Sequence, residues 1–274
     1  MSLFTIDHKK CAKDGICAAV CPLGLIRINE NCIPEPIENA GNLCISCGHC
    51  VAVCPNACFF HGILKTETFE PIKKEFNIGH EESIQFLRKR RSVRKYREKV
   101  VPEDEIVNLI ENARYAPTGH NSQTAEWHVI SGKEKVKKIA GLVIEWAKWL
   151  VENEPEFATQ MGFERFIKKW EGGEDAVLRG APALIIAHTN EKDLYGPKTC
   201  TIALTYLELA ATSMGLGTCW AGFLQLAVKS YEPLQKALGL PDGHIVQGGM
   251  MVGYPKFKYA RLPTRKEPVI TWGK

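Results

Sequence analysis

The sequence predicts an α+β protein built of two parts, and three observations support this fold class. The chain has 274 residues, which indicates about two domains. Its cysteines concentrate before residue 55, where one spacing occurs twice. After residue 80, helical and strand periodicities alternate irregularly, as expected for helices layered on a sheet. We therefore predict a cysteine-rich module over residues 1–62, a linker over 63–80 and a layered domain over 81–274.

The cysteine-rich module is an internal duplication with a shift of 33 residues. Its second copy has the spacing C-x2-C-x2-C-x3-C-P, which holds cubane iron–sulfur clusters in bacterial ferredoxins. In that pattern three thiolates bind one cluster, and the fourth, before a proline, binds a second cluster. The predicted ligands are, in chain order, Cys11, Asp14, Cys17, Cys21, Cys44, Cys47, Cys50 and Cys54.

Because the last cysteine of each copy binds the cluster held by the other copy, this crossed arrangement divides the ligands into two sets. The cysteine triplet of the second copy and Cys21 form one set, which predicts a 4Fe–4S cluster. Cys11, Cys17 and Cys54 form the other set, with Asp14 where the second copy has a cysteine. A carboxylate binds sulfide-bridged iron less well than a thiolate does. Three outcomes stay open: Asp14 binds the fourth iron, that iron carries water, or it is missing and the cluster is 3Fe–4S.

Other roles for the cysteines fit the spacing less well. Zinc sites are also built from C-x2-C pairs, but here each copy ends in a distal Cys-Pro. A disulfide framework is disfavoured because we recognise no secretory signal, and we expect a reducing, cytoplasmic location. Cys32 and Cys58 fall outside the repeat and are predicted to be small buried apolar side chains.

The layered domain begins with two predicted helices. Residues 81–91 place Ile84 and Leu87 on one helical face. Residues 101–115 begin with Pro102 and a run of acidic residues, which suits the positive end of a helix dipole. Hydrophobic periodicity predicts the remaining elements: helices over 133–152, 164–170 and 198–214, and strands over 183–188, 218–222 and 245–252.

Composition argues against two classes of function. Hydrophobic residues make up 45% of the chain and charged residues 24%, as in ordinary globular proteins. No apolar run is long enough to span a membrane. The net charge of +4 is too small to indicate a nucleic-acid partner, and no nucleic-acid motif accompanies the basic run over 88–99. We expect neither a membrane nor a nucleic acid as partner.

Three segments of the layered domain are similar to those of the nitroreductase family of FMN enzymes. They are RRSVR at 90–94, APTGHNSQ at 116–123 and GLGTCWAG at 215–222, followed by Gly253-Tyr254-Pro255 and a basic tail. With the cysteine module in front, the chain resembles the ferredoxin-fused subgroup. The resemblance implies a nitroreductase-like layered α/β/α domain preceded by a small ferredoxin-like two-cluster domain.

The same segments carry the FMN contacts that the resemblance implies. Arginine offers forked donors to the phosphate and the N1/C2=O edge, amides suit the ribityl hydroxyls, and small residues let backbone N–H groups approach N5 or O4. Family members also have a phosphate-binding arginine in the tail, where Arg265 is favoured over Arg261. The expected FMN residues are Arg90, Arg91, Ser92, Arg94, Pro117, Thr118, Gly119, Asn121, Gln123, Cys219, Trp220, Ala221, Gly222, Arg261 and Arg265.

Each segment also has a structural interpretation. The arginine-rich segment can be a solvated basic face, and Asn121 can cap a turn. Trp220 either borders the flavin ring or fills the core. The thiols of Cys200 and Cys219 are predicted to be buried apolar groups.

The resemblance implies an FMN oxidoreductase with its own electron path. Iron–sulfur clusters carry single electrons, whereas a flavin accepts one electron at a time and delivers two as hydride. The expected acceptors are nitroaromatics, quinones or similar conjugated small molecules, bound beside FMN at a homodimer interface. No catalytic side chain is predicted, because flavin N5 is itself the reactive atom.

Two questions stay open at this level. The electron donor is either a reduced ferredoxin or NAD(P)H, and no G-x-G-x-x-G motif indicates a separate dinucleotide domain. The alternative function is a non-enzymatic electron-transfer or redox-sensing flavo-iron–sulfur protein, in which bound FMN stores charge.

Overall fold

The computed structural model describes residues 2–273 and divides them into two compact units. The smaller unit comprises the residues up to Asn77 together with Gly119–Ser122, and the larger unit comprises Ile78–Thr118 and the residues from Gln123 onward. Each unit has its own hydrophobic core. Within residues 2–273, none of the helices combines the length and apolar composition that a bilayer crossing needs.

Residues 2–77 of the smaller unit consist of two short antiparallel ribbons, three one-turn helices and two 3-10 turns. β1 (Phe4–Ile6) pairs with β4 (Phe59–His61), and β2 (Ile26–Ile28) pairs with β3 (Pro34–Pro36). The rings of Phe4 and Phe59 pack with centroids 4.4 Å apart in its core. The other elements are α1 (Ile16–Ala19), α2 (Ala40–Leu43), α3 (His49–Ala52), η1 (Thr66–Thr68) and η2 (Lys74–Phe76).

The duplication of the cysteines is also a duplication of the backbone. Gly15 precedes α1 and Gly48 precedes α3, with φ values of 72° and 73°. Lys13 and Ser46 are left-handed as well, with φ of 57° and 51°. Both pairs are related by the 33-residue shift, as are β2 and β4. The two copies therefore present their cysteines from similar turns.

The larger unit is organised around a four-stranded antiparallel sheet in the order β5-β6-β8-β7. The strands are β5 (Glu126–Ser131), β6 (Ala183–Asn190), β7 (Gly217–Trp220) and β8 (His244–Gly253). In β6, Leu184 and Ile186 join one core cluster, whereas Ile185 and Ala187 join the other. A continuous apolar run is what a strand covered on both faces requires.

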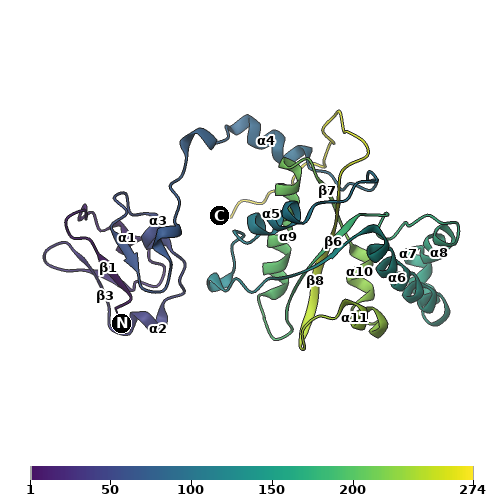
Figure 1. Cartoon of the computed structure of the whole chain (residues 1–274), viewed down its shortest axis with the longest axis horizontal. Helices are drawn as coiled ribbons and strands as arrows, with labels where there is room; N and C mark the ends of the chain where they lie inside the picture. The colour runs from purple at the N-terminus through teal and green to yellow at the C-terminus, as the bar shows by residue number, and fades with distance from the viewer. Residues whose placement is uncertain (1, 274) are drawn as a thin grey trace. The chain divides into compact units, whose positions relative to one another are not determined.

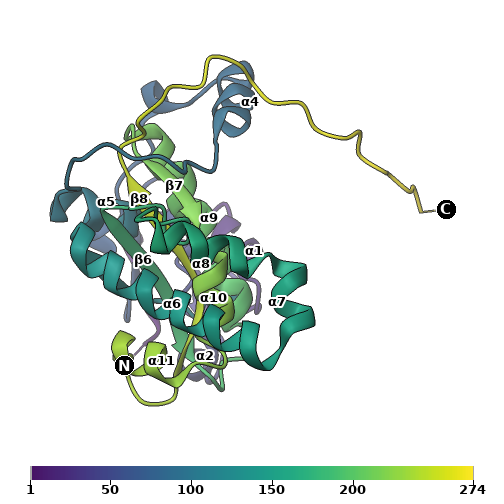
Figure 2. The same cartoon turned by 90° about the vertical axis from the view of Figure 1, so that its right-hand side faces the viewer.

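Helices cover both faces of this sheet (Figure 1). α5 (Glu103–Ala113) and α9 (Gly196–Ser213) pack on one face, and α6 (Lys133–Asn153), α10 (Gly222–Ala227) and α11 (Glu232–Leu238) pack on the other. α7 (Pro155–Met161) and α8 (Phe163–Glu171) lie against α6 (Figure 2). α4 (His80–Lys89) leads into the unit. The prediction of a layered α+β domain is confirmed.

Every helix and strand predicted for this domain is present, with ends that differ by at most two residues. Four elements were not predicted: β5, α7, α10 and α11. β5 lies at the edge of the sheet, and its side chains do not alternate between buried and exposed. The period-2 signal of a half-buried strand is therefore missing from its sequence.

Candidate cofactor sites

The larger unit contains a cavity of about 550 Å³ lined by the start of the RRSVR segment. Its walls come from the end of α4, the turn between α9 and β7, and the chain that follows β8. Its volume lies in the range typical of small-molecule sites. The cationic side chains that line it are Lys89, Arg90, Arg91, Arg97 and Lys258. Such a set is suited to an anionic ligand.

Backbone contacts hold the RRSVR segment against β7. The N–H of Val93 donates to the carbonyl of Thr218 over 2.8 Å, and Ser92 forms a parallel bridge with Thr218. A Cβ on Gly217 would lie 2.5 Å from Val93 Cγ2 and 2.9 Å from Pro255 Cγ. The small size of Gly217 thus allows two segments of the protein, those of Val93 and Pro255, to approach the strand closely.

The three arginines of the segment have different surroundings. Arg90 Nη1 lies 2.9 Å from Glu208 Oε1, so this cation of the cavity wall already has a carboxylate partner. The Arg91 guanidinium lies 5.6 Å from the centre of the Tyr259 ring. Arg94 does not line the cavity and lies beside Cys219, where its charge opposes the burial that raises the pKa of that thiol. Of the two arginines of this segment that line the cavity, Arg90 is thus paired with a carboxylate, whereas Arg91 lies over an aromatic ring.

The APTGHNSQ segment lies outside this cavity. Gly119–Asn121 forms the 3-10 turn η3, and the Gln123 N–H donates to Thr118 Oγ1 over 3.1 Å. Asn121 Nδ2 donates to the carbonyls of Ile45 and Ser46 over 3.1 and 3.0 Å within the smaller unit. Pro117 is likewise absent from the cavity lining. A contact of these residues with FMN remains a prediction.

The GLGTCWAG segment continues from the cavity wall into the core. Trp220 packs against the core cluster under α9, and the Ala221 N–H donates to the Gly249 carbonyl over 2.9 Å. Gly222 faces open space, since a Cβ there would meet no atom within 4 Å. Cys200 and Cys219 are buried as predicted. Of the backbone groups proposed to meet the flavin, that of Gly222 is therefore the most accessible.

The C-terminal tail does not bring its arginines to the cavity. Residues 256–273 form no helix or strand. Arg261 and Arg265 are both exposed, and Arg265 Nη1 donates to the carbonyl of Thr264. Lys258 is the tail cation that lines the cavity, and it was not predicted because the family pattern places an arginine in the tail.

In the smaller unit, one small cavity gathers four cysteines from both copies of the repeat. Cys21 lines it together with Cys44, Cys47 and Cys50. Backbone N–H groups of Leu25 and Ser46 donate to the sulfurs of Cys21 and Cys44, each over 3.4 Å. These residues form the set that the crossed arrangement predicted. Four thiolates suit zinc or iron–sulfur chemistry, and N–H···S bonds are a means of tuning cluster potentials.

A second small cavity gathers the other predicted set. It is lined by Cys11, Asp14, Cys17 and Cys54, together with Cys58. The sulfurs of Cys54 and Cys58 lie 3.4 Å apart, and the Cys58 N–H also donates to the Cys54 sulfur over 3.4 Å. Asp14 Oδ1 accepts the backbone N–H of Ile16 over 3.2 Å. The donor set is thus three predicted cysteines, one carboxylate and one additional thiol.

The two cysteines outside the repeat do not behave alike. Cys58 is buried, as predicted, but it lines a ligand cavity rather than only filling the core. The prediction of a buried Cys32 is wrong, because this residue is exposed. It lies in the turn between β2 and β3 with φ of 58°, and its N–H donates to the Asn29 carbonyl. A tight hairpin turn leaves no core for its side chain to enter.

Burial raises the pKa of several cavity thiols in the protein alone. The pKa of Cys50 rises to about 11, mainly because burial disfavours the thiolate, and burial raises the pKa of Cys17 as well. A thiol that coordinates a metal is deprotonated by it. The thiols of Cys17 and Cys50 are therefore neutral in the protein alone, which is compatible with their packing.

Comparisons with known proteins concern the larger unit. The model of the Nitroreductase family matches residues 87–254. The FMN reductase (NAD(P)H) of Bacillus subtilis strain 168 is 28% identical over 183 residues, which cover 66% of this chain and 69% of that protein. The 4-nitrobenzoate reductase of Nocardioides sp. strain LMS-CY is 24% identical over 215 residues, covering 67% and 85%. The crystal structure of a nitroreductase with bound FMN from Bacteroides fragilis NCTC 9343 matches with a TM-score of 0.56 and 24% identity, covering 70% of this chain and 99% of that one.

Proposed function

This chain belongs to the nitroreductase family of oxidoreductases, and we propose that it binds FMN and two iron–sulfur clusters and reduces conjugated small molecules. The observation that carries the proposal is the grouping of the cysteines. Two cavities gather the two crossed ligand sets, although each set combines residues from both copies of the repeat. Two-cluster ferredoxins use this crossed arrangement.

FMN is proposed for the cavity of about 550 Å³. Its cationic wall suits the phosphate dianion, with Arg91 and Lys258 as the side chains that would hold it. Leu216 and Gly217 supply an apolar surface on the same wall. The relative from Bacteroides fragilis binds FMN, which supports this choice of cofactor. When bound, FMN exchanges electrons singly or as a hydride.

Iron–sulfur clusters are proposed for the two cysteine cavities, and the donor chemistry fits them. The cavity of Cys21 offers four thiols, as a 4Fe–4S cluster requires. The cavity of Asp14 offers three cysteines of the repeat and a choice of fourth ligand. Zinc in the same cavities is the alternative, and it would leave the module without redox activity. When bound, the clusters supply one-electron transfer.

The reaction proposed for the larger unit is a two-electron reduction. A nitroarene takes two electrons and two protons to give a nitroso compound and water, and a quinone takes the same to give a hydroquinone. The electrons come from NAD(P)H or from a reduced ferredoxin-type protein. One relative is named an FMN reductase (NAD(P)H), which supports NAD(P)H as the donor. Another is named a 4-nitrobenzoate reductase, which supports nitroaromatics as acceptors. We expect NAD(P)H alone to reduce the flavin slowly, because the cysteine module offers a separate entry for single electrons.

A homodimer is part of the proposal. Ile202 and Tyr206 lie four residues apart on the same face of α9, and 37% and 41% of their surfaces are exposed. An apolar pair at this spacing on a long helix suits an interface between two copies. Size-exclusion chromatography with light scattering should give twice the chain mass for the wild type. A monomeric holoprotein that still turns over would contradict this assignment.

The cluster proposal is tested by counting iron and sulfide in protein purified and reconstituted without oxygen. We expect seven or eight irons per chain, from one four-iron and one three- or four-iron cluster. Cys21→Ser should remove the cluster whose other ligands lie in the second copy, and Cys54→Ser should remove the cluster at Asp14. Cys200→Ser, a buried cysteine of the larger unit, is the matched control and should leave iron unchanged. Zinc in place of iron would reject the clusters.

The catalytic proposal has a separate readout. Wild-type holoprotein should turn over 4-nitrobenzoate or a benzoquinone repeatedly with NADH or a reduced ferredoxin as donor. Stoichiometric bleaching of flavin and clusters without turnover would instead favour the electron carrier or redox sensor. Fast bleaching of the flavin by NADH in anaerobic stopped flow would count against the slow entry of electrons from NAD(P)H.

A further inference from the structure

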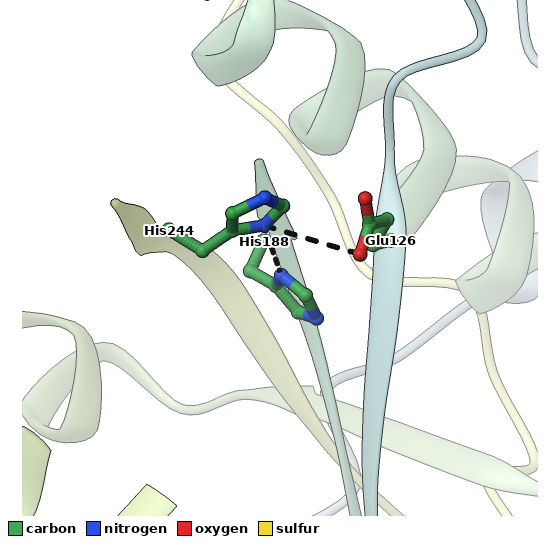
Figure 3. Close-up of side chains that lie close together, drawn as sticks. All are labelled: Glu126, His188 and His244. Carbon is green, nitrogen blue, oxygen red and sulfur yellow. Dashed lines mark hydrogen bonds and ion pairs between the residues drawn. The ribbon is translucent and has the colours of Figure 1, made fainter. Parts of the chain in front are cut away.

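Three side chains of metal-binding type meet at one end of the sheet of the larger unit, and none of them lines the proposed FMN cavity. Glu126 is the first residue of β5, His244 is the first residue of β8, and His188 lies on β6 between them. β6 runs antiparallel to both neighbours, and Glu126 pairs directly with His188. A register shift between Ala187 and His188 adjusts the pairing with β8 at this point. The three side chains converge in Figure 3.

The distances among the donor atoms are close to those of a metal site. His188 Nδ1 and His244 Nδ1 lie 3.0 Å apart, and His244 Nδ1 lies 3.9 Å from Glu126 Oε2. One ligand atom from each residue lies within 4.8 Å of the others. Two donors on one tetrahedral zinc ion, each at about 2.0–2.1 Å, are roughly 3.3–3.4 Å apart. The contact between the two histidines would lengthen by about 0.3–0.4 Å and the contact between His244 and Glu126 would shorten by about 0.5–0.6 Å to seat the ion, and Glu126 would move toward His188.

Burial and charge at this point also suit a cation. His188 is buried, and the side chain of His244 is 14% exposed, so both rings are held by the sheet. Glu126 is 58% exposed and can adjust toward the rings while supplying a negative charge. His244 also lines a cavity of about 780 Å³ beside α11, which gives an ion and a water molecule access.

We propose that Glu126, His188 and His244 bind one divalent transition metal ion, with Zn²⁺ as the expected occupant. Two imidazoles and one carboxylate are a zinc ligand set, and three protein ligands leave a fourth position for water. The ion would link β5, β6 and β8 through side chains at one end of the sheet. Tyr254 and Pro255, which line the proposed FMN cavity, follow the opposite end of β8, about 30 Å along the strand at 3.3 Å per residue.

The test uses the full chain with its two cysteine cavities filled by clusters, so that zinc does not compete for the cluster cysteines and any binding to a remaining thiol such as Cys32 is seen as a sulfur neighbour. Wild-type holoprotein is given one equivalent of ZnCl₂, desalted and analysed for zinc by mass spectrometry and by X-ray absorption at the zinc edge. We expect about one zinc per chain with only nitrogen and oxygen neighbours at about 2.0–2.1 Å. A sulfur shell at about 2.3 Å would place the zinc on cysteines and overturn the proposal.

Variants make the assignment specific. Because loss of a supporting hydrogen bond weakens metal binding 10–100-fold, loss of the direct ligand in His244→Gln should weaken it by about 100-fold or more. His80→Gln changes an exposed histidine at the start of α4 and should bind zinc like the wild type. Glu126→Gln alters an exposed residue, so it tests the site even if a histidine variant fails to fold. No retained zinc in the wild type, or equal binding by wild type, His244→Gln and Glu126→Gln, would overturn the proposal.

Discussion

The Arg90 guanidinium and the Glu208 carboxylate form an ion pair of 2.9 Å that joins the RRSVR segment to the middle of α9. Glu208 is the one acidic residue of α9 and is buried, whereas the Arg90 side chain is 26% exposed at the cavity wall. Thr218 Oγ1 also donates to Glu208 Oε1, over 3.4 Å. A buried carboxylate needs such partners, so Glu208 fixes the position of the segment that begins the proposed FMN site.

Replacement of Arg90 should therefore destabilise the larger unit. Arg90→Ala leaves the Glu208 charge buried without its cation, and we expect a loss of about 3 kcal/mol in the free energy of unfolding. Urea unfolding followed by tryptophan fluorescence measures this unit, because all six tryptophans lie between residues 127 and 272. Arg88→Ala, on the exposed part of α4, is the control and should cost no more than about 0.5 kcal/mol.

A second substitution separates charge from packing in this effect. Adding Glu208→Gln to Arg90→Ala removes the unpaired charge and keeps the shape of the side chain, so it should recover part of the lost stability. Equal urea midpoints for the Arg90→Ala and Arg88→Ala variants would show that the ion pair does not hold the segment.

Two glycines of the GLGTCWAG segment should respond differently to alanine. In Gly217→Ala the new methyl group would meet Val93 and Pro255, and overpacking of this kind costs about 1–3 kcal/mol. Gly222→Ala meets no atom and should leave the urea midpoint unchanged or slightly higher. If the flavin approaches the Gly222 backbone, the same methyl group should lower the FMN content of the purified variant. Normal FMN content in a stable Gly222→Ala protein would remove Gly222 from the site.

The sequence predicted elements well where one periodicity decides the structure. The apolar run of β6 needs burial on both faces, and the three-and-four spacing of α6 needs burial on one, so both could be located without tertiary information. The edge strand β5 has neither pattern. Short helices such as α10 depend on packing against α6 rather than on their own propensity, so their sequences carry little signal.

The same contrast holds for the candidate sites: those defined by a local repeat could be predicted from the sequence, and those formed by tertiary contacts could not. The 33-residue repeat was sufficient to group the cysteines, because both copies fold alike. No repeat relates Glu126, His188 and His244, which are far apart in sequence and meet only through strand register. Local sequence patterns also could not show that Arg90 would form an ion pair with Glu208, because these residues are 118 positions apart.

The accessible thiol of this chain should be Cys32. The thiolate is the reactive form, and burial raises the pKa of Cys200 to about 12, so this thiol stays protonated at pH 8. Cys219 is also buried with a raised pKa, whereas Cys32 is exposed in a turn. Brief treatment of the holoprotein with iodoacetamide should add one group, mapped to Cys32 by mass spectrometry, and Cys32→Ser should add none. Rapid modification of Cys200 or Cys219 would contradict the burial of these side chains.

The fourth ligand of the cluster proposed near Asp14 can be identified by paired substitutions. Asp14 stands where the second copy has Cys47, and its cavity also contains Cys58. If the carboxylate is a weak ligand, the oxidised wild type should give a three-iron EPR signal, because the fourth iron is lost. Asp14→Cys supplies the missing thiolate and should abolish that signal while raising the iron count from about seven to about eight per chain.

Cys58→Ala is the matched variant in the same cavity. The Cys58 N–H, a backbone group that alanine retains, donates to the Cys54 sulfur, so this bond should persist and the wild-type spectrum and iron count should be unchanged. Loss of iron from Cys58→Ala together with an unchanged spectrum for Asp14→Cys would assign the fourth position to Cys58. Since a thiolate holds sulfide-bridged iron more firmly than a carboxylate, that result would also predict a four-iron cluster that persists in the oxidised wild type.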